Sequence, residues 1–149
     1  MQTTVEPFTI LLVEDNPAHA ELVARSLEGH QIANKIYHVP DGEAALNYLF
    51  RRGEYTDPAQ YPRPNLILLD IRLPKASGLE ILKQIKRHNE LQFIPVVILT
   101  TSAAEQDVAG AYHEHANSYL IKPADFAEFS KLMEELGYYW LGWNHFFKR

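Results

Sequence analysis

The sequence predicts an α/β fold of the (βα)5 type: a doubly wound, five-stranded parallel sheet that forms a three-layer sandwich with helices on both faces. Short apolar runs alternate with amphipathic segments five times along the chain. The runs are continuously apolar, as expected for strands that are buried on both faces of a sheet. Alternation of strands and helices favours a parallel sheet that is connected by right-handed crossovers.

The first two strand–helix units carry clear boundary signals. Residues 8–13 form an apolar run that is expected to be the first strand. Asn16 and Pro17 then suit the N-cap and the first position of a helix. Residues 33–39 are expected to form the second strand, and residues 40–42 turn the chain into the second helix.

Three further strands are expected over residues 65–69, 94–100 and 118–123. Residues 51–64 contain Gly53 and three prolines, so they are predicted to form an extended surface loop. Residues 103–116 suit a helix with few large apolar side chains, which we expect to be loosely packed. Asp125 and Glu128 have the spacing of a capping box at the start of the last helix.

Composition excludes several classes of function. The chain has 149 residues, no cysteine and a formal net charge of −5. The length fits one domain with a substantial core, and the acidic balance argues against a nucleic-acid binder, which usually carries a basic stripe. No apolar run reaches the roughly eighteen residues of a membrane span, and the first residues lack a signal-peptide pattern. We therefore expect a cytoplasmic protein without disulfides or a membrane anchor.

Polar side chains follow four of the five expected strands. They are Glu14, Asp15, Asp70, Thr100 and Lys122. The carboxyl ends of parallel strands share one rim of the sheet, where sites of open α/β folds are found. Any one of these residues is explained by the ordinary preferences of turns. Together they make a candidate site, because each residue ends an apolar strand or lies in the turn that follows it, and their chemistry is complementary.

Three carboxylates on one rim would repel one another, which raises their pKa values unless a cation holds them together. A set of oxygen ligands that leaves positions for water suits Mg²⁺, which often bridges a carboxylate and a phosphoryl oxygen. Asp70 could then attack phosphorus as a nucleophile and form an aspartyl phosphate. Lys122 could neutralise the phosphoryl oxygens, and Thr100 could donate a hydrogen bond to them.

The same residues resemble the signature of two-component receiver domains, which have a flavodoxin/CheY-like fold. The resemblance extends over residues 8–137. It implies that Asp70 accepts a phosphoryl group from a histidine of a sensor kinase and passes the signal on in a phosphorelay. It also implies that Asp15 and Asp70 bind Mg²⁺ directly, that the carbonyl of Arg72 is a third ligand, and that Glu14 acts through water.

The resemblance further implies a switch. Thr100 would be the switching hydroxyl, Tyr119 the aromatic residue whose rotamer follows it, and Lys122 the partner of the phosphoryl group. A phosphoryl group adds roughly −1.5 to −2 charges, which would favour a second packing of residues 103–116. The expected protein is a signalling protein rather than an enzyme, with slow self-dephosphorylation and an output through contacts with a downstream protein.

Some details depart from the family or refine the assignment. Glu14 stands where an aspartate is commoner, and Thr101 replaces a usual small residue, which would restrict access to the phosphoryl group. The family's Lys-Pro peptide is often cis, and Lys122-Pro123 permits this form. The long loop over residues 51–64 and the aromatic tail are similar to regulators that are paired with cyanobacterial phytochromes, so a bacterial phytochrome is the expected kinase.

The tail over residues 138–149 is rich in aromatic residues, and no DNA-binding or enzymatic domain is predicted after the last helix. The candidate interface residues are Tyr138, Tyr139, Trp140, Trp143, Phe146 and Phe147. An exposed patch of this kind is normally covered. Two alternatives stay open at this point: the tail folds back over its own domain, or it forms a homodimer or kinase-docking surface that is anchored by Tyr and Trp.

Three functions other than a receiver make different demands on the sequence. A haloacid-dehalogenase-like phosphatase would need a second aspartate two residues after Asp70, where Arg72 stands. A flavodoxin-like cofactor binder would need a phosphate-cradling loop after the first strand, where Glu14 and Asp15 would repel phosphate. A constitutive interaction module that is never phosphorylated is compatible with the sequence. A transition-metal site at His113 and His115 is disfavoured, because helix positions two apart face different directions.

Overall fold

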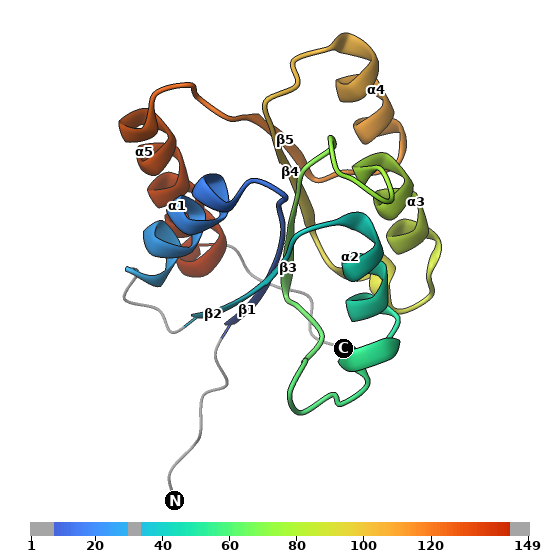
Figure 1. The fold of residues 1–149 in the computed structure, drawn as a ribbon. Coiled ribbons are helices and arrows are strands. Elements are labelled where there is room, and N and C mark those ends of the chain that lie inside the picture. Colours follow the sequence, from blue (N-terminus) through green and yellow to red (C-terminus); the bar gives the residue numbers. More distant parts are fainter. Residues whose placement is uncertain (1–7, 30–33, 144–149) are drawn as a thin grey trace, which may run out of the picture.

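The computed structural model describes residues 8–29 and 34–143, and it confirms the predicted fold class. Five parallel strands form one sheet in the order β2-β1-β3-β4-β5 (Figure 1). The strands are β1 (Phe8–Val13), β2 (Asn34–Val39), β3 (Leu66–Leu69), β4 (Val96–Thr100) and β5 (Ser118–Ile121). The helices are α1 (Pro17–Glu28), α2 (Gly42–Leu49), α3 (Gly78–Arg87), α4 (Glu105–His113) and α5 (Phe126–Gly137).

Helices cover both faces of the sheet. Helices α1 and α5 lie on one face, and α2, α3 and α4 lie on the other (Figure 1). Strand β3 supplies both cores, because its side chains alternate between the faces. Leu66 and Leu68 pack in the core under α1 and α5, whereas Ile67 and Leu69 pack in the core under the other three helices. All four side chains are fully buried, which explains why this strand is apolar at every position.

Side-chain caps fix the start of several helices where the sequence predicts them. The Asn16 side chain accepts hydrogen bonds from the first turn of α1, and Asp125 does the same for α5. Helix α4 has no side-chain cap, and only Asp107 and Ala111 of its residues are buried. This helix is therefore held by few apolar contacts, in agreement with the predicted loose packing. It is also shorter than the expected residues 103–116.

The loop over residues 51–64 is more ordered than the sequence predicts. It contains a short 3-10 helix, η1 (Gly53–Tyr55), and its tyrosines pack against tyrosines from β2 and α2. The Tyr48 hydroxyl donates a hydrogen bond of 2.7 Å to the Pro62 carbonyl. Because Tyr48 is buried, this bond satisfies its hydroxyl and ties the loop to α2.

The tail continues α5 as a π-helical segment, η3 (Tyr138–Trp143). Trp140 is only 9% exposed and joins the core under α1 and α5, so at this residue the tail packs against its own domain. A role of Trp140 in an interface stays a prediction. Tyr138 and Tyr139 are 64% and 54% exposed. The Trp143 side chain and residues Phe146 and Phe147 lie outside the part that the structure describes.

None of the helices in residues 8–29 and 34–143 combines the length and the apolar character that crossing a membrane requires.

Candidate functional site

The register of the sheet brings the predicted site residues together. Val13 pairs with Leu69 across β1 and β3, so the residues that follow them, Glu14 and Asp70, lie side by side on the rim. Thr100 ends β4 and pairs with Ile121 of β5, which places Lys122 next to it. The expected convergence of the strand ends is therefore what the fold produces.

Lys122 is the centre of this cluster. Its side chain is 2% exposed, and its ammonium forms ion pairs with Glu14 and Asp70; the distance from Nζ to Asp70 Oδ2 is 3.0 Å. A third contact of 3.0 Å joins Nζ to Nδ1 of His19 on α1. One buried cation thus compensates two buried carboxylates, which is how buried charges are usually tolerated.

The three acids form a compact cluster that is open on one side. Carboxylate oxygens of Glu14, Asp15 and Asp70 lie within 4.8 Å of one another, and among the described residues no other acid, histidine or cysteine cluster of this kind occurs. Glu14 is 1% exposed and Asp70 6%, whereas Asp15 is exposed. Burial raises the pKa of Glu14, and its contacts with Lys122 partly offset this effect. Hard oxygen donors beside solvent fit a divalent cation such as Mg²⁺.

The turn after β3 holds Asp70 in place. The Asp70 amide donates to the Val13 carbonyl at 3.1 Å, and Asp70 Oδ1 accepts from the amide of Arg72 at 3.1 Å. Gly78, the first residue of α3, packs directly against this turn. A Cβ atom on Gly78 would lie 2.2 Å from the Asp70 carbonyl oxygen and 2.7 Å from Ile71 Cα. Only glycine allows this approach, so the start of α3 supports the turn from behind.

A second hydrogen-bond network joins this turn to α4. Asp107 Oδ2 accepts from the Arg72 guanidinium at 2.8 Å and from the Ser102 hydroxyl at 2.5 Å. The Ser102 amide lies 3.3 Å from the Thr100 hydroxyl, and the Tyr119 hydroxyl donates to the Ser102 carbonyl at 2.8 Å. The hydrogen bond from Ser102 and the charge of Arg72 lower the pKa of Asp107. Residues near Asp70 and the end of β4 are therefore connected to the helix that the switch is expected to move.

Several site residues escaped the sequence reasoning. They are His19, His38, Ser102 and Asp107, and they contact Lys122, the Glu14 carbonyl and the α4 network. For His19, the available signal was its position one turn into a helix that starts directly after the acidic pair. Thr101 is exposed, and its expected effect on access to the phosphoryl group stays a prediction. The described residues contain no cis peptide bond, so Lys122-Pro123 is trans and does not adopt the cis form that the sequence permits.

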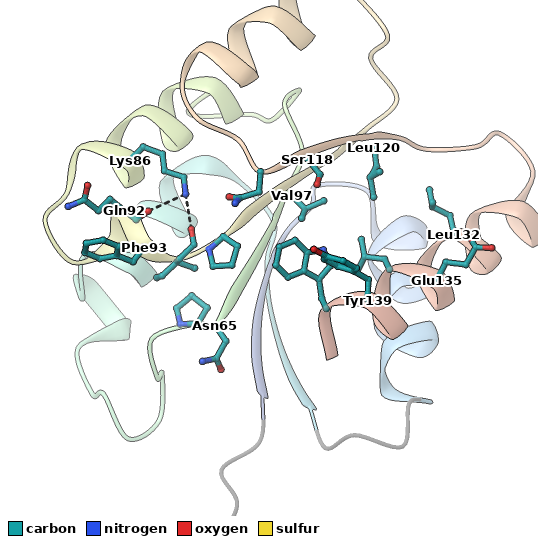
Figure 2. A pocket seen from close by; sticks show the side chains of 16 residues that line it. Asn65, Lys86, Gln92, Phe93, Val97, Ser118, Leu120, Leu132, Glu135 and Tyr139 are labelled. Atoms are coloured by element: carbon teal, nitrogen blue, oxygen red, sulfur yellow. Dashed lines mark hydrogen bonds between the residues drawn. The ribbon is translucent and has the colours of Figure 1, made fainter. Parts of the chain in front are cut away.

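A groove of about 840 Å³ lies near the amino-terminal ends of the strands, away from the rim that carries Asp70 (Figure 2). Its lining includes residues that precede or begin strands, such as Asn65 and Ser118, together with Tyr139 of the tail. On its far side Lys86 donates to the carbonyls of Gln92 and Ile94, at 3.2 and 2.9 Å (Figure 2). None of the rim residues lines this groove, so its size does not make it the site of the chemistry.

Comparison with known proteins decides the family. The sequence model of the family described as the response regulator receiver domain matches residues 10–134 of this chain. The chain belongs to the receiver-domain family of response regulators. It is 48% identical to the probable methanogenesis regulatory protein FilR2 of Methanothrix harundinacea, over 93% of this chain and 87% of that protein.

Solved structures of relatives support the same assignment. The Mn²⁺-bound form of response regulator Rcp1, a protein of Synechocystis, is 41% identical, with a TM-score of 0.90 over 95% of this chain and 100% of that one. The phosphorylated cyanobacterial phytochrome response regulator RcpA is 36% identical, with a TM-score of 0.90 over 96% of this chain and 100% of that one. Membership of this family removes the phosphatase and flavodoxin-like alternatives.

Proposed function

We propose that this protein accepts a phosphoryl group on Asp70 from the phosphohistidine of a sensor histidine kinase. An Asp70 carboxylate oxygen attacks phosphorus, the bond from phosphorus to the kinase imidazole breaks, and the departing imidazole takes a proton. The observation that supports this most is the contact of 3.0 Å between Lys122 and Asp70, because it places a buried cation beside the oxygen that would carry the phosphoryl group.

The acidic cluster is proposed to hold Mg²⁺ during transfer. Asp15 and Asp70 would be direct ligands with the carbonyl of Arg72, and Glu14 would act through water. The ion would neutralise charge on the phosphoryl oxygens as they approach the carboxylates. Lys122 would contribute a second positive charge, since its ammonium already lies beside both buried acids.

The output is proposed to depend on Thr100 and Tyr119. Thr100 lies at the end of β4 with its hydroxyl next to the Ser102 amide, and Tyr119 holds the Ser102 carbonyl. A phosphoryl group on Asp70 would attract the Thr100 hydroxyl, which would release Ser102 and favour another packing of α4. The changed face of α4 would then contact a downstream protein. Slow self-dephosphorylation would reset the switch.

Phosphoryl acceptance is tested by intact mass. The protein is incubated with Mg²⁺ and acetyl phosphate, and the same treatment is given to the Asp70→Asn variant. We expect the mass increment of one phosphoryl group on the parent chain and none on the variant. No increment on either protein would favour the constitutive interaction module, and an increment on both would move the acceptor away from Asp70.

A phytochrome is proposed as the kinase. This proposal is supported by the likeness to RcpA over 96% of the chain and by the long loop and the aromatic tail. The test is the initial rate of phosphotransfer from a purified cyanobacterial phytochrome kinase, compared with a non-phytochrome histidine kinase. A rate for the phytochrome that is no higher than for the control kinase would reject the pairing.

A homodimer is proposed through the tail. It is supported by the exposure of Tyr138 and Tyr139, since tyrosines of this kind are frequent anchors of interfaces. Light scattering over a range of concentrations would compare the parent with the Tyr138→Ser/Tyr139→Ser double variant. We expect a dimer mass for the parent and a monomer mass for the variant. A monomer mass for the parent at all concentrations would reject the dimer.

A further inference from the structure

We propose that His19 is a positioning residue for Lys122, and that its imidazole fixes the ammonium for phosphoryl transfer to Asp70. The inference rests on the proposed function. It starts from one contact: Nδ1 of His19 lies 3.0 Å from Nζ of Lys122. Helix α1 thereby contributes a side chain to a site whose other members follow strands.

The contact completes the hydrogen bonding of a buried cation. A lysine ammonium has three N–H donors and no acceptor. The three acceptors around Nζ are carboxylate oxygens of Glu14 and Asp70 and the imidazole nitrogen of His19. Two of these acceptors are charged, and His19 supplies the third without adding another negative charge to the acidic rim. An unpaired N–H on an ammonium this deeply buried would be costly.

The same contact sets the state of the imidazole. An ammonium can only donate, so the nitrogen that faces it must be the unprotonated one, and the proton lies on Nε2. Burial and the charge of Lys122 both lower the pKa of His19, which agrees with a neutral ring. A protonated ring would place two cations in contact.

Packing holds the ring in this orientation. The His19 ring lies edge-on to Phe129 and Phe126 of α5, with centroid distances of 5.5 and 6.3 Å. The His19 amide donates to the Asn16 side chain at the start of α1. The imidazole is thus held between α1 and α5, and its position does not depend on the ammonium alone.

This arrangement has a consequence for phosphoryl transfer. Of the two Asp70 oxygens, Oδ1 accepts from the Arg72 amide and Oδ2 accepts from Lys122. Attack by Oδ2 requires that Lys122 release it, after which the freed N–H of Lys122 can contact a phosphoryl oxygen. His19 and Glu14 keep the other two N–H groups and hold the ammonium at the rim while this exchange occurs. Without His19, the ammonium is expected to move toward the carboxylates, which makes the Asp70 oxygen less available.

Two substitutions separate positioning from packing. His19→Asn keeps an acceptor near the place of Nδ1, whereas His19→Phe keeps an aromatic ring against Phe126 and Phe129 and removes the acceptor. The rate of phosphorylation by acetyl phosphate with Mg²⁺ is followed by intact mass, and urea unfolding checks that both variants are folded. We expect His19→Phe to be slower by roughly ten- to a hundredfold, the size of one lost hydrogen bond to a charged group, and His19→Asn to recover most of the rate. A parent-like rate in His19→Phe, or an equal loss in both variants, would overturn the inference.

A second measurement does not depend on phosphorylation. Nitrogen-15 NMR of the resting protein reports the His19 tautomer, and we expect a proton on Nε2 and none on Nδ1. The Lys122 Nζ resonance is expected to shift in His19→Phe more than in His19→Asn. A proton on Nδ1 would overturn the inference even where acetyl phosphate labels the protein. Failure of the parent chain to be labelled, with the expected tautomer present, would instead count against the proposed function.

Discussion

Replacing Asp15 by asparagine is expected to change protein stability in opposite directions with and without Mg²⁺. Asp15 is exposed, and its carboxylate lies within 4.8 Å of the buried carboxylates of Glu14 and Asp70. Without metal its charge adds net repulsion to the rim, because two buried carboxylates face it and only one ammonium, that of Lys122, compensates them. With metal the same charge becomes part of the binding site. The variant should therefore be more stable than the parent in a chelator and less stable in saturating Mg²⁺.

The two effects are of similar size. At 4.8 Å, two like charges repel by about 0.9 kcal/mol in water and about 3.5 kcal/mol at an effective dielectric constant of 20. Because Asp15 is exposed, the lower figure is the better guide, and repulsion by two carboxylates less attraction by the Lys122 ammonium leaves a gain of about 1 kcal/mol for the variant. Metal at one hundred times its dissociation constant stabilises the folded parent by about 2.7 kcal/mol. The order of stability should then reverse.

The assay is urea unfolding at pH 7 with EDTA or with Mg²⁺ in large excess. Glu134→Gln is the matched control, since Glu134 is an exposed acid on α5 and its loss changes the net charge equally. The control should respond to Mg²⁺ as the parent does. If Asp15→Asn gains as much stability from Mg²⁺ as the parent, Asp15 is not a ligand. If it is less stable than the parent in EDTA, the acids do not repel as the geometry requires.

Three further predictions concern the buried acid, the turn and the switch. Burial raises the pKa of Glu14 above its ordinary 4.5, so its contribution to the unfolding free energy is complete below pH 4.5 and is lost as the pH rises through the raised pKa. In EDTA the parent should therefore lose stability relative to Glu14→Gln across this window; a constant difference in urea unfolding would contradict it. Gly78→Ala should destabilise the fold by about 1 to 3 kcal/mol, because its Cβ would overlap the Asp70 turn, whereas Gly110→Ala, in the same assay, should stay within about 1 kcal/mol of the parent. Tyr119→Ala should still be phosphorylated, as judged by mass, but should lose any phosphoryl-dependent change in hydrogen exchange of α4; an unchanged response would reject the switch.

The sequence predicts the sheet well because each strand is buried on both faces and leaves little choice of residue. Leu66 to Leu69 are apolar at every position for this reason. The sequence also predicts that Asp70 and Lys122 lie on the same rim, since the register of parallel strands places the residues that follow the strands there. These are properties of the backbone topology, which apolar patterning determines directly.

Side-chain directions between elements could not be predicted in the same way. Nothing local in the sequence shows that His19 contacts Lys122, because the contact depends on how α1 and α5 pack. The ion pair between Arg72 and Asp107 likewise depends on the placement of α4. The burial of Trp140 follows from the way η3 continues α5 over the core, and an aromatic-rich tail is equally compatible with an exposed surface.

The resting site is best understood as a competition for Lys122. Its ammonium is paired with both buried carboxylates, so it offsets part of their repulsion and at the same time engages Asp70. A bound dication would take over part of that neutralisation, which would free Lys122 to turn one N–H toward an incoming phosphoryl group. Asp15, the exposed acid of the cluster, would then favour the binding of the dication, because the charge of Asp15 is compensated only when the metal is bound. On the proposed function, the same three charges would lower stability without metal and would bind the metal that prepares Asp70 for phosphorylation, and the reversal expected for Asp15→Asn measures how Asp15 contributes to stability in the two states.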